Sequence, residues 1–463
     1  MSVLISLADL VAIALFIYGL HELNSPATAR RGNRLAMLGM AIALAGILVQ
    51  TQGAGWLSVL VGVVVGGAIG VFAAIKVKMT AMPQMVALYN GAGGGAAALI
   101  STVQYFVAVP NGNIGDVVAV SLVLSAIIGA VSFSGSIVAF LKLQEVMTGR
   151  PITYPGQQFV NAIVLLAIVG LAVWLVWTLG VLPEWAYPVL LLAALLLGVL
   201  FVLPIGGADM PVVISLLNSF TGVAVAITGF EIDSTLLIIC GALVGASGTI
   251  LTVAMSRAMN RPLTNVLFGA FGSAGGTDPA AAGGGPQQIR ATSADDVAVM
   301  LAYASKVIFV PGYGMAVAQA QHSVKALADQ LEKRGVKVLY AIHPVAGRMP
   351  GHMNVLLAES NVPYNQLLDM EDVNPEFPTA EVALVVGAND VTNPAARTVT
   401  SSPIYGMPIL DVDKAGNVVV LKRSMRSGFA GIENPLYEMP NTSMLFGDAK
   451  ASVDALTAAV KAV

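Results

Sequence analysis

The sequence predicts a polytopic α-helical membrane domain of nine spans, followed by an α/β Rossmann-like domain built on a parallel sheet. Long apolar runs fill the first 289 residues, which carry only 18 of the 49 Asp, Glu, Lys and Arg residues; the last 174 residues carry the other 31. In that last part strand-like runs alternate with helical ones, which is typical of a parallel sheet covered on both faces. The predicted boundaries are a membrane domain at 1–260, a flexible linker at 261–289 and a soluble domain at 290–463.

Nine apolar runs before residue 257 are long enough to cross a bilayer. A helix needs about 20 mostly apolar residues to span ~30 Å of hydrocarbon. The first run is interpreted as a span and not as a cleaved signal peptide, because no basic residue precedes it and further spans follow at once. The runs are approximately 2–20, 35–50, 54–75, 83–109, 115–141, 158–181, 185–203, 210–229 and 235–256.

The basic residues of this part predict its orientation, because loops rich in Lys and Arg stay on the cytoplasmic side. All nine fall in alternate connections or directly after the last span: Arg30, Arg31, Arg34, Lys76, Lys78, Lys142, Arg150, Arg257 and Arg261. The remaining connections contain none. We therefore expect the N-terminus outside and everything after residue 257 in the cytoplasm.

Polar side chains inside the spans are candidates for function, because each costs free energy in hydrocarbon unless it is paired or faces water. Asp209 has an alternative role as N-cap of the eighth span, with Pro211 in the first turn. Asn90 and Asn218 have the alternative of hydrogen bonding between helices. Glycines such as Gly62, Gly66 and Gly70 are expected to allow close helix packing. The polar candidates are Asp9, Asn90, Glu145, Asn161, Asp209 and Asn218.

Composition excludes several classes of function. The net charge of −3 gives no basic excess for a nucleic-acid partner. The single cysteine, Cys240, can form neither a disulfide framework nor a metal or iron–sulfur site within this chain. No pair of histidines lies within the spans, which disfavours a bis-histidine haem. We expect no metal site.

Residues 269–289 combine Gly, Ala and Pro without hydrophobic periodicity and are interpreted as a tether. The domain after it contains five strand-like runs, "KVIFV", "VKVLYAI", "EVALVVG", "MPILD" and "NVVVL". Helical patterns are expected at 315–334, 351–359 and 448–462.

Gly312-x-Gly314-x-x-Val317 lies between the first strand and the first helix, where a pyrophosphate can approach the backbone. A simple tight strand-to-helix turn is the alternative. The second strand ends in "YAIHP", without the acidic residue that holds a ribose 2′-hydroxyl in ordinary NAD sites. The fifth strand ends in Lys422, Arg423 and Ser424, two cations and a hydroxyl suited to a 2′-phosphate, or else a solvated strand end.

Several longer motifs resemble the β subunit of the proton-translocating NAD(P) transhydrogenases. In the soluble part these are "PGYGMAVAQAQ", "IHPVAGRMPGHMNVLLAE", "GANDVTNPAA", "KRSM" with "GFAGIENPL", and "MLFGDAKASVDA"; in the membrane part it is "ADMPVVISLLNS". The likeness extends over essentially the whole chain. It implies hydride transfer between NAD(H) on a partner subunit and NADP(H) bound here, coupled to proton movement across the membrane.

The resemblance also implies roles for individual residues. Lys422, Arg423 and Ser424 would bind the 2′-phosphate, and the reversed orientation of NADP in this family would account for the missing acid after the second strand. Phe429 departs from the Tyr expected in many relatives. The other implied cofactor-binding residues are Gly312, Tyr313, Gly314, Ala316, Val317, Arg348, Gly387, Ala388, Asn389, Asp390, Gly428, Ala430 and Gly431. Asn90, Asp209 and Asn218 would belong to the proton path or its coupling.

Only one nucleotide turn is present, so NAD is expected on the α subunit of the family. Two αβ units in a bacterial inner membrane are implied as well. Several relatives carry a His at the position of Asn90, and Asn cannot carry a proton. The titrating group is therefore expected on a membrane helix of the α subunit. No side chain here is expected to act as a chemical catalyst, because the two nicotinamide rings exchange the hydride directly.

Two other classes compete with this interpretation. One is a channel or transporter regulated by a cytoplasmic nucleotide domain, but no "TVGYG"-like filter is present and no acid follows the second strand. The other is a quinone-linked membrane dehydrogenase, for which metal ligands are lacking.

Overall fold

The structure is a computed structural model of the 463-residue chain. It describes residues 2–25, 28–50, 55–77, 81–108, 115–144, 146–148, 151–178, 185–206, 209–258, 263, 289–348, 351–400, 402, 404–425, 428 and 432–463. The chain divides into two compact units, one made of 1–205 with 213–252 and the other of 206–212 with 253–463. The predicted tether at 269–288 lies outside the described residues.

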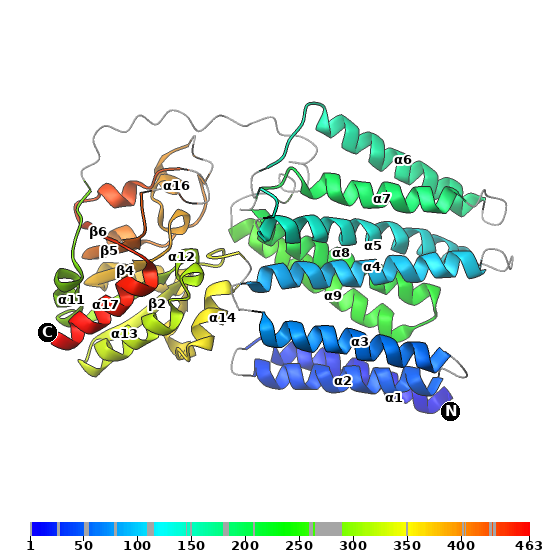
Figure 1. The fold of residues 1–463 in the computed structure, drawn as a ribbon, viewed down its shortest axis with the longest axis horizontal. Coiled ribbons are helices and arrows are strands. Elements are labelled where there is room, and N and C mark those ends of the chain that lie inside the picture. The colour runs from blue at the N-terminus through cyan, green and yellow to red at the C-terminus, as the bar shows by residue number, and fades with distance from the viewer. Residues whose placement is uncertain are drawn as a thin grey trace. The chain divides into compact units, whose positions relative to one another are not determined.

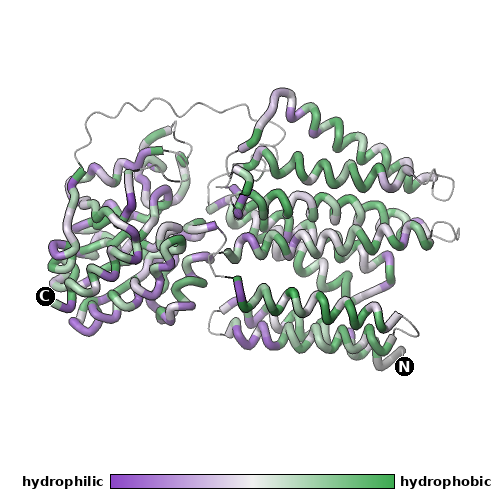
Figure 2. Tube along the Cα trace, viewed as in Figure 1, coloured by the Kyte–Doolittle hydropathy of each residue, from purple (hydrophilic) through white to green (hydrophobic). Residues whose placement is uncertain are grey.

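The helical unit is a set of long apolar helices (Figures 1 and 2). Among the described residues eight helices have the length and composition to cross a membrane, and α7 is a shorter apolar helix of 17 residues, at the lower limit for a span. The nine predicted runs thus each form a helix. They are α1 (Ser2–Glu22), α2 (Ala29–Gln50), α3 (Gly55–Lys76), α4 (Met82–Ala108), α5 (Asp116–Leu143), α6 (Gln157–Trp177), α7 (Ala186–Val202), α8 (Met210–Glu231) and α9 (Thr235–Ala258).

The interior of this unit lies around α4, α5 and α7, where α5 has the longest buried face. Small residues allow the close contact: a Cβ added at Gly94 of α4 would lie 2.8 Å from the carbonyl oxygen of Gly129 in α5. Any larger residue would separate the two helices. Gly62, Gly66 and Gly70 of α3 differ, because a Cβ at these positions would meet nothing within 4 Å.

Lys142 anchors the end of α5 to the end of α7. Its ammonium group donates hydrogen bonds to the carbonyl oxygens of Val202 (3.3 Å), Leu203 and Ile205 (2.8 Å). The last carbonyls of a helix have no partner within the helix, and a cation there also interacts favourably with the helix dipole. Among the described residues, this buried lysine thus has three carbonyl oxygens as partners.

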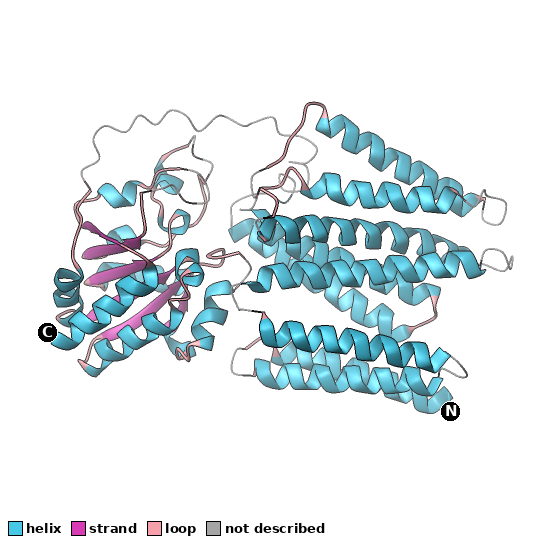
Figure 3. Ribbon diagram, viewed as in Figure 1, coloured by secondary structure: helices cyan, strands magenta, loops and turns pink. Residues whose placement is uncertain are grey.

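The second unit is a six-stranded, fully parallel sheet with the order β3-β2-β1-β4-β5-β6 (Figure 3). Its strands are β1 (Lys306–Pro311), β2 (Lys337–Ile342), β3 (Leu367–Asp369), β4 (Val382–Val386), β5 (Asn417–Lys422) and β6 (Thr442–Phe446). The central strands are almost entirely buried, as expected for a sheet covered on both faces. This confirms the Rossmann-like fold.

Helices cover one face of the sheet, and connecting segments cover the other. On one face α11 (Ala294–Ala302), α13 (Gln321–Lys333) and α17 (Ala449–Ala462) pack together. On the other face, alternate residues of the strands, such as Ile308, Ala383 and Val420, pack against Phe377 and Leu410 from the connecting segments. The remaining short helices are α12 (Tyr313–Val317), α14 (His352–Glu359), α15 (Met370–Val373) and α16 (Ala395–Thr398).

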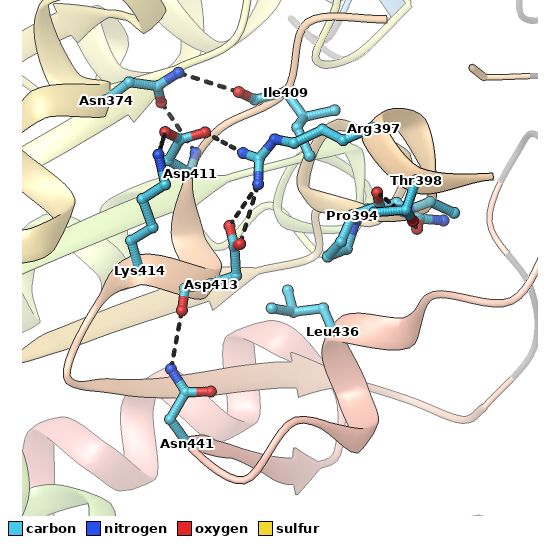
Figure 4. Close-up of polar contacts among 12 residues, drawn as sticks. Asn374, Pro394, Arg397, Thr398, Ile409, Asp411, Asp413, Lys414, Leu436 and Asn441 are labelled. Carbon is cyan, nitrogen blue, oxygen red and sulfur yellow. Dashed lines mark hydrogen bonds and ion pairs between the residues drawn. The ribbon is translucent and has the colours of Figure 1, made fainter. Parts of the chain in front are cut away.

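The run "MPILD" at 407–411 does not form the predicted strand. Pro408 has no N–H for a strand ladder, and the backbone of this segment bonds to a side chain instead (Figure 4). Asn374 donates to the carbonyl of Ile409 (3.1 Å) and accepts from the N–H of Asp411 (3.0 Å). Arg397 then pairs with Asp411 and with Asp413, 3.0 Å away. The segment therefore lies against the sheet as a fixed loop.

Two further expectations need correction. The helix expected at 315–334 is broken, because Gln319 takes a φ of 51° between α12 and α13. The strands β3 and β6 were not predicted. β3 is only three residues long, and β6 is a five-residue run that begins with Thr and Ser, so both have a weak hydrophobic pattern.

Candidate nucleotide-binding site

A cleft opens at the edge of the sheet where β1, β4 and β5 end. The strand order reverses between β1 and β4, and in open parallel sheets ligands bind outside the carboxyl ends of the strands at such a switch point. The cleft is partly open to solvent and has a volume of about 240 Å³. It is lined by Gly314, Gly387, Ala388, Asn389, Leu421, Lys422, Arg423, Ser424, Gly428, Gly447 and Ala449.

The glycines of the first turn allow two loops to meet backbone to backbone. Gly312 donates to the carbonyl of Val386 (2.9 Å) and Gly314 to that of Gly387 (2.9 Å). A Cβ at Gly312 would lie 2.3 Å from the Cα of Ala388, and one at Gly314 would lie 2.7 Å from the Cα of Gly387. The two glycines thus have a packing role, and Gly314 also lines the cleft.

The cationic side of the cleft comes from the end of β5. Arg423 and Ser424 are exposed, whereas Lys422 is half-buried with its ammonium group 4.7 Å from the centre of the Tyr437 ring. Burial lowers the pKa of Lys422, and the nearby carboxylate of Asp390 acts in the opposite direction. A bound phosphate would add a second anion that favours the charged ammonium form.

Asn389 organises the loop after β4. Its side-chain oxygen accepts hydrogen bonds from Tyr437 (2.6 Å) and from Asn434 (3.1 Å), and Asn434 also donates to its backbone carbonyl (3.1 Å). The side-chain nitrogen of Asn389 is buried without a hydrogen-bond partner among the described residues. A Cβ at Gly428 would lie 2.1 Å from that nitrogen. A buried donor without a partner among the described residues, a glycine that allows its loop to approach that donor closely, and two cations are features that fit a phosphorylated nucleotide.

The loops after β1 and β2 meet in a second cluster of predicted residues. The Arg348 guanidinium lies 4.5 Å from the centre of the Tyr313 ring, a distance typical of a cation–π interaction. His352 accepts a hydrogen bond at Nδ1 from the backbone N–H of Arg348 (3.1 Å). Ala316 is fully buried and Val317 is largely exposed.

The structure thus brings together residues from four separate sequence motifs. Phe429, Ala430 and Gly431 lie outside the described residues. Sequence reasoning missed Leu421, Gly447 and Ala449 in the cleft wall, and Tyr437 and Asn434 behind it. The sequence did contain a signal for these five residues, because they lie in or beside the segments "KRSM", "GFAGIENPL" and "MLFGDAKASVDA", which carry the family resemblance.

Asn90 lies in a polar contact between three membrane helices. Asn90 is buried in α4, and its side chain donates to the backbone carbonyl of Ile214 in α8 (3.1 Å). The hydroxyl of Thr221 donates to the backbone carbonyl of Asn90 (3.0 Å). Ser132 of α5 lies 2.6 Å from the Thr221 hydroxyl. The structure therefore places Thr221, and Ser132 behind it, beside the backbone carbonyl of Asn90; the sequence did not single out either hydroxyl residue.

The other polar candidates lie apart from this contact. Asp209 directly precedes α8, the position expected of an N-cap, and Asn218 is half-buried in α8. Asn161 is fully buried in α6, where the hydroxyl of Tyr154 lies 3.4 Å from its side-chain oxygen. Asp9 is half-buried in α1, and Glu145 lies outside the described residues.

Two buried histidines predict a loss of stability in acid. Burial lowers the pKa of His343 to about 4, although its bond to the Pro408 carbonyl (2.8 Å) opposes this. Burial also lowers the pKa of His352 to about 4, and the charge of Arg348 contributes. Because the unfolded chain binds protons from about pH 6.5 downward and the folded chain does not, stability present above that pH is lost as the pH falls towards 4.

We expect the loss to reach about 1.4 kcal/mol per pH unit for each histidine. It is measured as the free energy of urea unfolding of residues 290–463, followed by circular dichroism between pH 7.5 and 4.5. His343→Gln should reduce the slope, whereas His322→Gln, at an exposed position, should not. A stability that stays constant down to pH 5 would contradict the assignment.

The apolar helices have the length to span a membrane, and the second unit is a Rossmann-like domain with a cleft at its switch point. Together they define the class: a membrane protein with a domain of the nucleotide-binding type. Comparison with known proteins identifies the family within this class. The family model for the NAD(P) transhydrogenase beta subunit matches residues 5–459. The chain belongs to this family of oxidoreductases.

Curated relatives agree over the full length. The protein named NAD(P) transhydrogenase subunit beta from Rhodospirillum rubrum is 51% identical over 458 residues, which is 98% of each chain. A second sequence of that name, from a designated strain of the same organism, matches to the same extent. The resemblance seen in the sequence motifs is therefore confirmed, and with it membership of an enzyme that acts with an α subunit.

Proposed function

We propose that this chain binds NADP(H) in the cleft at the ends of β1, β4 and β5, and that it exchanges a hydride with NAD(H) on an α subunit while protons cross the membrane. The observation that carries the proposal is the position of Lys422, Arg423 and Ser424 on the wall of a cleft at the switch point. These side chains suit a 2′-phosphate, which NADP has and NAD lacks.

The protein residues contribute binding and orientation to this reaction. Bound NADP(H) supplies the nicotinamide ring that accepts or donates the hydride. Lys422 and Arg423 would hold the 2′-phosphate, and Gly314, Gly387 and Ala388 would offer their backbone to the pyrophosphate. Asn389, held by Tyr437 and Asn434, would direct its buried side-chain N–H₂ group to the cofactor. Tyr313, Ala316, Val317, Arg348, Asp390 and the segment Gly428–Gly431 would complete the site.

We also propose that Asn90, Asp209 and Asn218 belong to the proton path or its coupling to the nucleotide domain. Asn90 supports this because it is buried and polar and lies beside two hydroxyl groups: Thr221 of α8 donates to its backbone carbonyl, and Ser132 of α5 contacts Thr221. Asn cannot titrate, so the carrier beside it would be a histidine of the α subunit. Coupling would require two states of the nucleotide domain, one open for exchange and one closed for hydride transfer.

The remaining architecture belongs to the same proposal. The membrane domain would span 1–260, the linker 261–289 and the NADP domain 290–463. The nine basic residues of the first part support an N-terminus outside and an NADP domain in the cytoplasm of a bacterial inner membrane. Two αβ units would form the complete enzyme.

Proteoliposomes containing this chain and its α subunit test the proposal. Given NADPH and an oxidised NAD analogue, they should reduce the analogue and move protons in proportion. A channel regulated by a nucleotide would move protons without a matching reduction. Reduction of the analogue without proton movement would show that hydride transfer is not coupled to proton movement.

Asn90→Leu is expected to slow coupled turnover about tenfold or more. The apolar side chain removes the hydrogen bond to the Ile214 carbonyl and places hydrocarbon at a site that needs water. The measurement is the rate of NAD-analogue reduction together with proton movement in proteoliposomes.

Asn90→His provides the comparison, because matching relatives are expected to carry that side chain and activity should be partly retained. Asn161→Leu is a second comparison, since Asn161 is buried in α6, outside the Asn90 contact. Normal proton movement in the Asn90→Leu variant would show that Asn90 contributes only to helix packing.

A further inference from the structure

Buried and half-buried polar residues form a row along α4, α5 and α8. The row has three levels. The first is Asn90 with Ser132 and Thr221; the second is Ser125 of α5 with Thr228 of α8, 2.7 Å apart; the third is Ser101 of α4 with Glu231 of α8. We call these seven residues the polar row.

The spacing of the row follows helix geometry. Thr221 and Thr228 are seven residues apart, or about 10 Å along α8, and Glu231 lies about 5 Å further. On α4, Asn90 and Ser101 are eleven residues, or about three turns, apart, so they lie on one face. The row therefore runs from the first third of α4 to the last residue of α8.

Glu231 is the carboxyl group of the row. It is 8% exposed at the end of α8, and both of its carboxylate oxygens lie within hydrogen-bond distance of the Ser101 hydroxyl, at 2.8 and 2.9 Å. Among the described residues no Lys or Arg forms an ion pair with it. A buried carboxyl group without a cation is unusual for a residue that only stabilises the fold, because burying an unpaired charge is costly.

The contact with Ser101 accommodates both protonation states. When Glu231 is ionised, the Ser101 hydroxyl donates to the carboxylate. When Glu231 is protonated, its O–H donates to Ser101, and the Ser101 hydroxyl turns to the carbonyl of Ala97, which lies 3.1 Å away. Rotation of one hydroxyl is enough to exchange the two arrangements, so the hydrogen bond between Glu231 and Ser101 is kept whether or not the carboxyl group holds a proton.

We propose that Glu231 binds and releases the transported proton at the end of the polar row opposite Asn90. The inference rests on the proposed coupling of hydride transfer to proton movement. The nine basic residues place the α8–α9 connection outside, so Glu231 would exchange protons with the external side. Because the first two levels are about 10 Å apart, water has to enter the row for protons to pass between them.

Among the described residues, an ionisable group that interacts with Glu231 from a neighbouring helix is the phenol of Tyr187 in α7. Tyr187 of α7 stacks on Tyr105 of α4 with ring centres 4.2 Å apart, and the Tyr187 hydroxyl lies 3.3 Å from that of Thr102. Neither phenol supplies a positive charge. Glu231 is thus the one carboxyl group in the described row, and the other six members are hydroxyl or amide side chains.

The test uses proteoliposomes with the α subunit and compares Glu231→Gln, Glu231→Asp and Asp116→Asn. Glutamine keeps the shape and the hydrogen bond to Ser101 but cannot carry the proton. Asp116 is an exposed carboxylate at the start of α5 and serves as the matched control. Coupled turnover and proton movement of Glu231→Gln should fall about tenfold or more, with NADP affinity unchanged. Glu231→Asp should restore part of the rate, and Asp116→Asn should match the unmodified protein.

Infrared difference spectra supply a readout independent of turnover. A protonated-carboxyl band that changes with pH should be present in the unmodified complex, displaced in Glu231→Asp and missing in Glu231→Gln. Full proton pumping by Glu231→Gln, or a band unchanged by both substitutions, would overturn the inference. If the unmodified complex moves no protons at all, the proposed function fails instead, and the infrared band still decides whether Glu231 titrates.

Discussion

Replacing Lys422 and Arg423 together with alanine is expected to weaken NADP binding about 10²- to 10⁴-fold and to leave NAD binding nearly unchanged. Two charge-assisted contacts to a phosphate dianion contribute roughly 1.5–3 kcal/mol each, and each 1.4 kcal/mol corresponds to about a factor of ten. NAD carries no phosphate at that position, so it does not make these contacts.

The measurement is the dissociation constant of each nucleotide for the purified chain, by titration calorimetry at two salt concentrations. The NADP affinity of the unmodified chain should fall with salt, and that of the double variant should fall less. Lys333 and Lys461, both exposed, provide the control: their double alanine variant loses the same charge away from the cleft. An equal loss of affinity for NADP and NAD would show that the two cations do not read the 2′-phosphate.

Gly387→Ala is expected to destabilise the nucleotide domain by about 2–5 kcal/mol and to weaken NADP binding. Gly387 has a φ of +69°, and a left-handed conformation costs a residue with a Cβ roughly 1–2 kcal/mol. The new Cβ would also lie 2.4 Å from the Cα of Gly314, and such overpacking typically costs about 1–3 kcal/mol. The two loops that form the cleft floor would have to separate.

Gly335→Ala separates these two causes. Gly335 has a φ of +85°, but a Cβ there would meet nothing within 4 Å, so only the conformational cost applies. Both variants are compared by the urea-unfolding free energy of residues 290–463, and NADP affinity is measured in the full chain. Equal destabilisation by the two variants would mean that the contact between the loops adapts without cost.

The sequence by itself determined the two-part architecture and the family. Hydrophobic length is a local property, so each of the nine apolar runs could be identified as a helix without knowledge of its neighbours. The strands β1, β2, β4 and β5 were predicted for the same reason, because buried parallel strands form continuous apolar runs. Long motifs such as "GANDVTNPAA" were specific enough to identify the family that the comparisons confirm.

Other features depended on contacts between distant parts of the chain. The apolar run "MPILD" is not a strand, because Asn374, 35 residues away from Ile409, bonds to its backbone. Gly312 and Gly314 looked like a phosphate turn, and only the structure shows that they also press against the loop after β4. Asn434 and Tyr437 donate hydrogen bonds to the side chain of Asn389, and the sequence could not predict this because both residues lie 45 or more positions from Asn389.

The polar row shows the same division within the membrane part. Ser101, Ser125 and Thr228 are ordinary residues of apolar helices in the sequence, and Glu231 falls where a span ends and a connection begins. Only the packing of α4 and α5 against α8 buries them and joins them by hydrogen bonds. A side chain's cost in a membrane depends on what it faces, and the direction it faces is decided by tertiary packing, not by hydropathy.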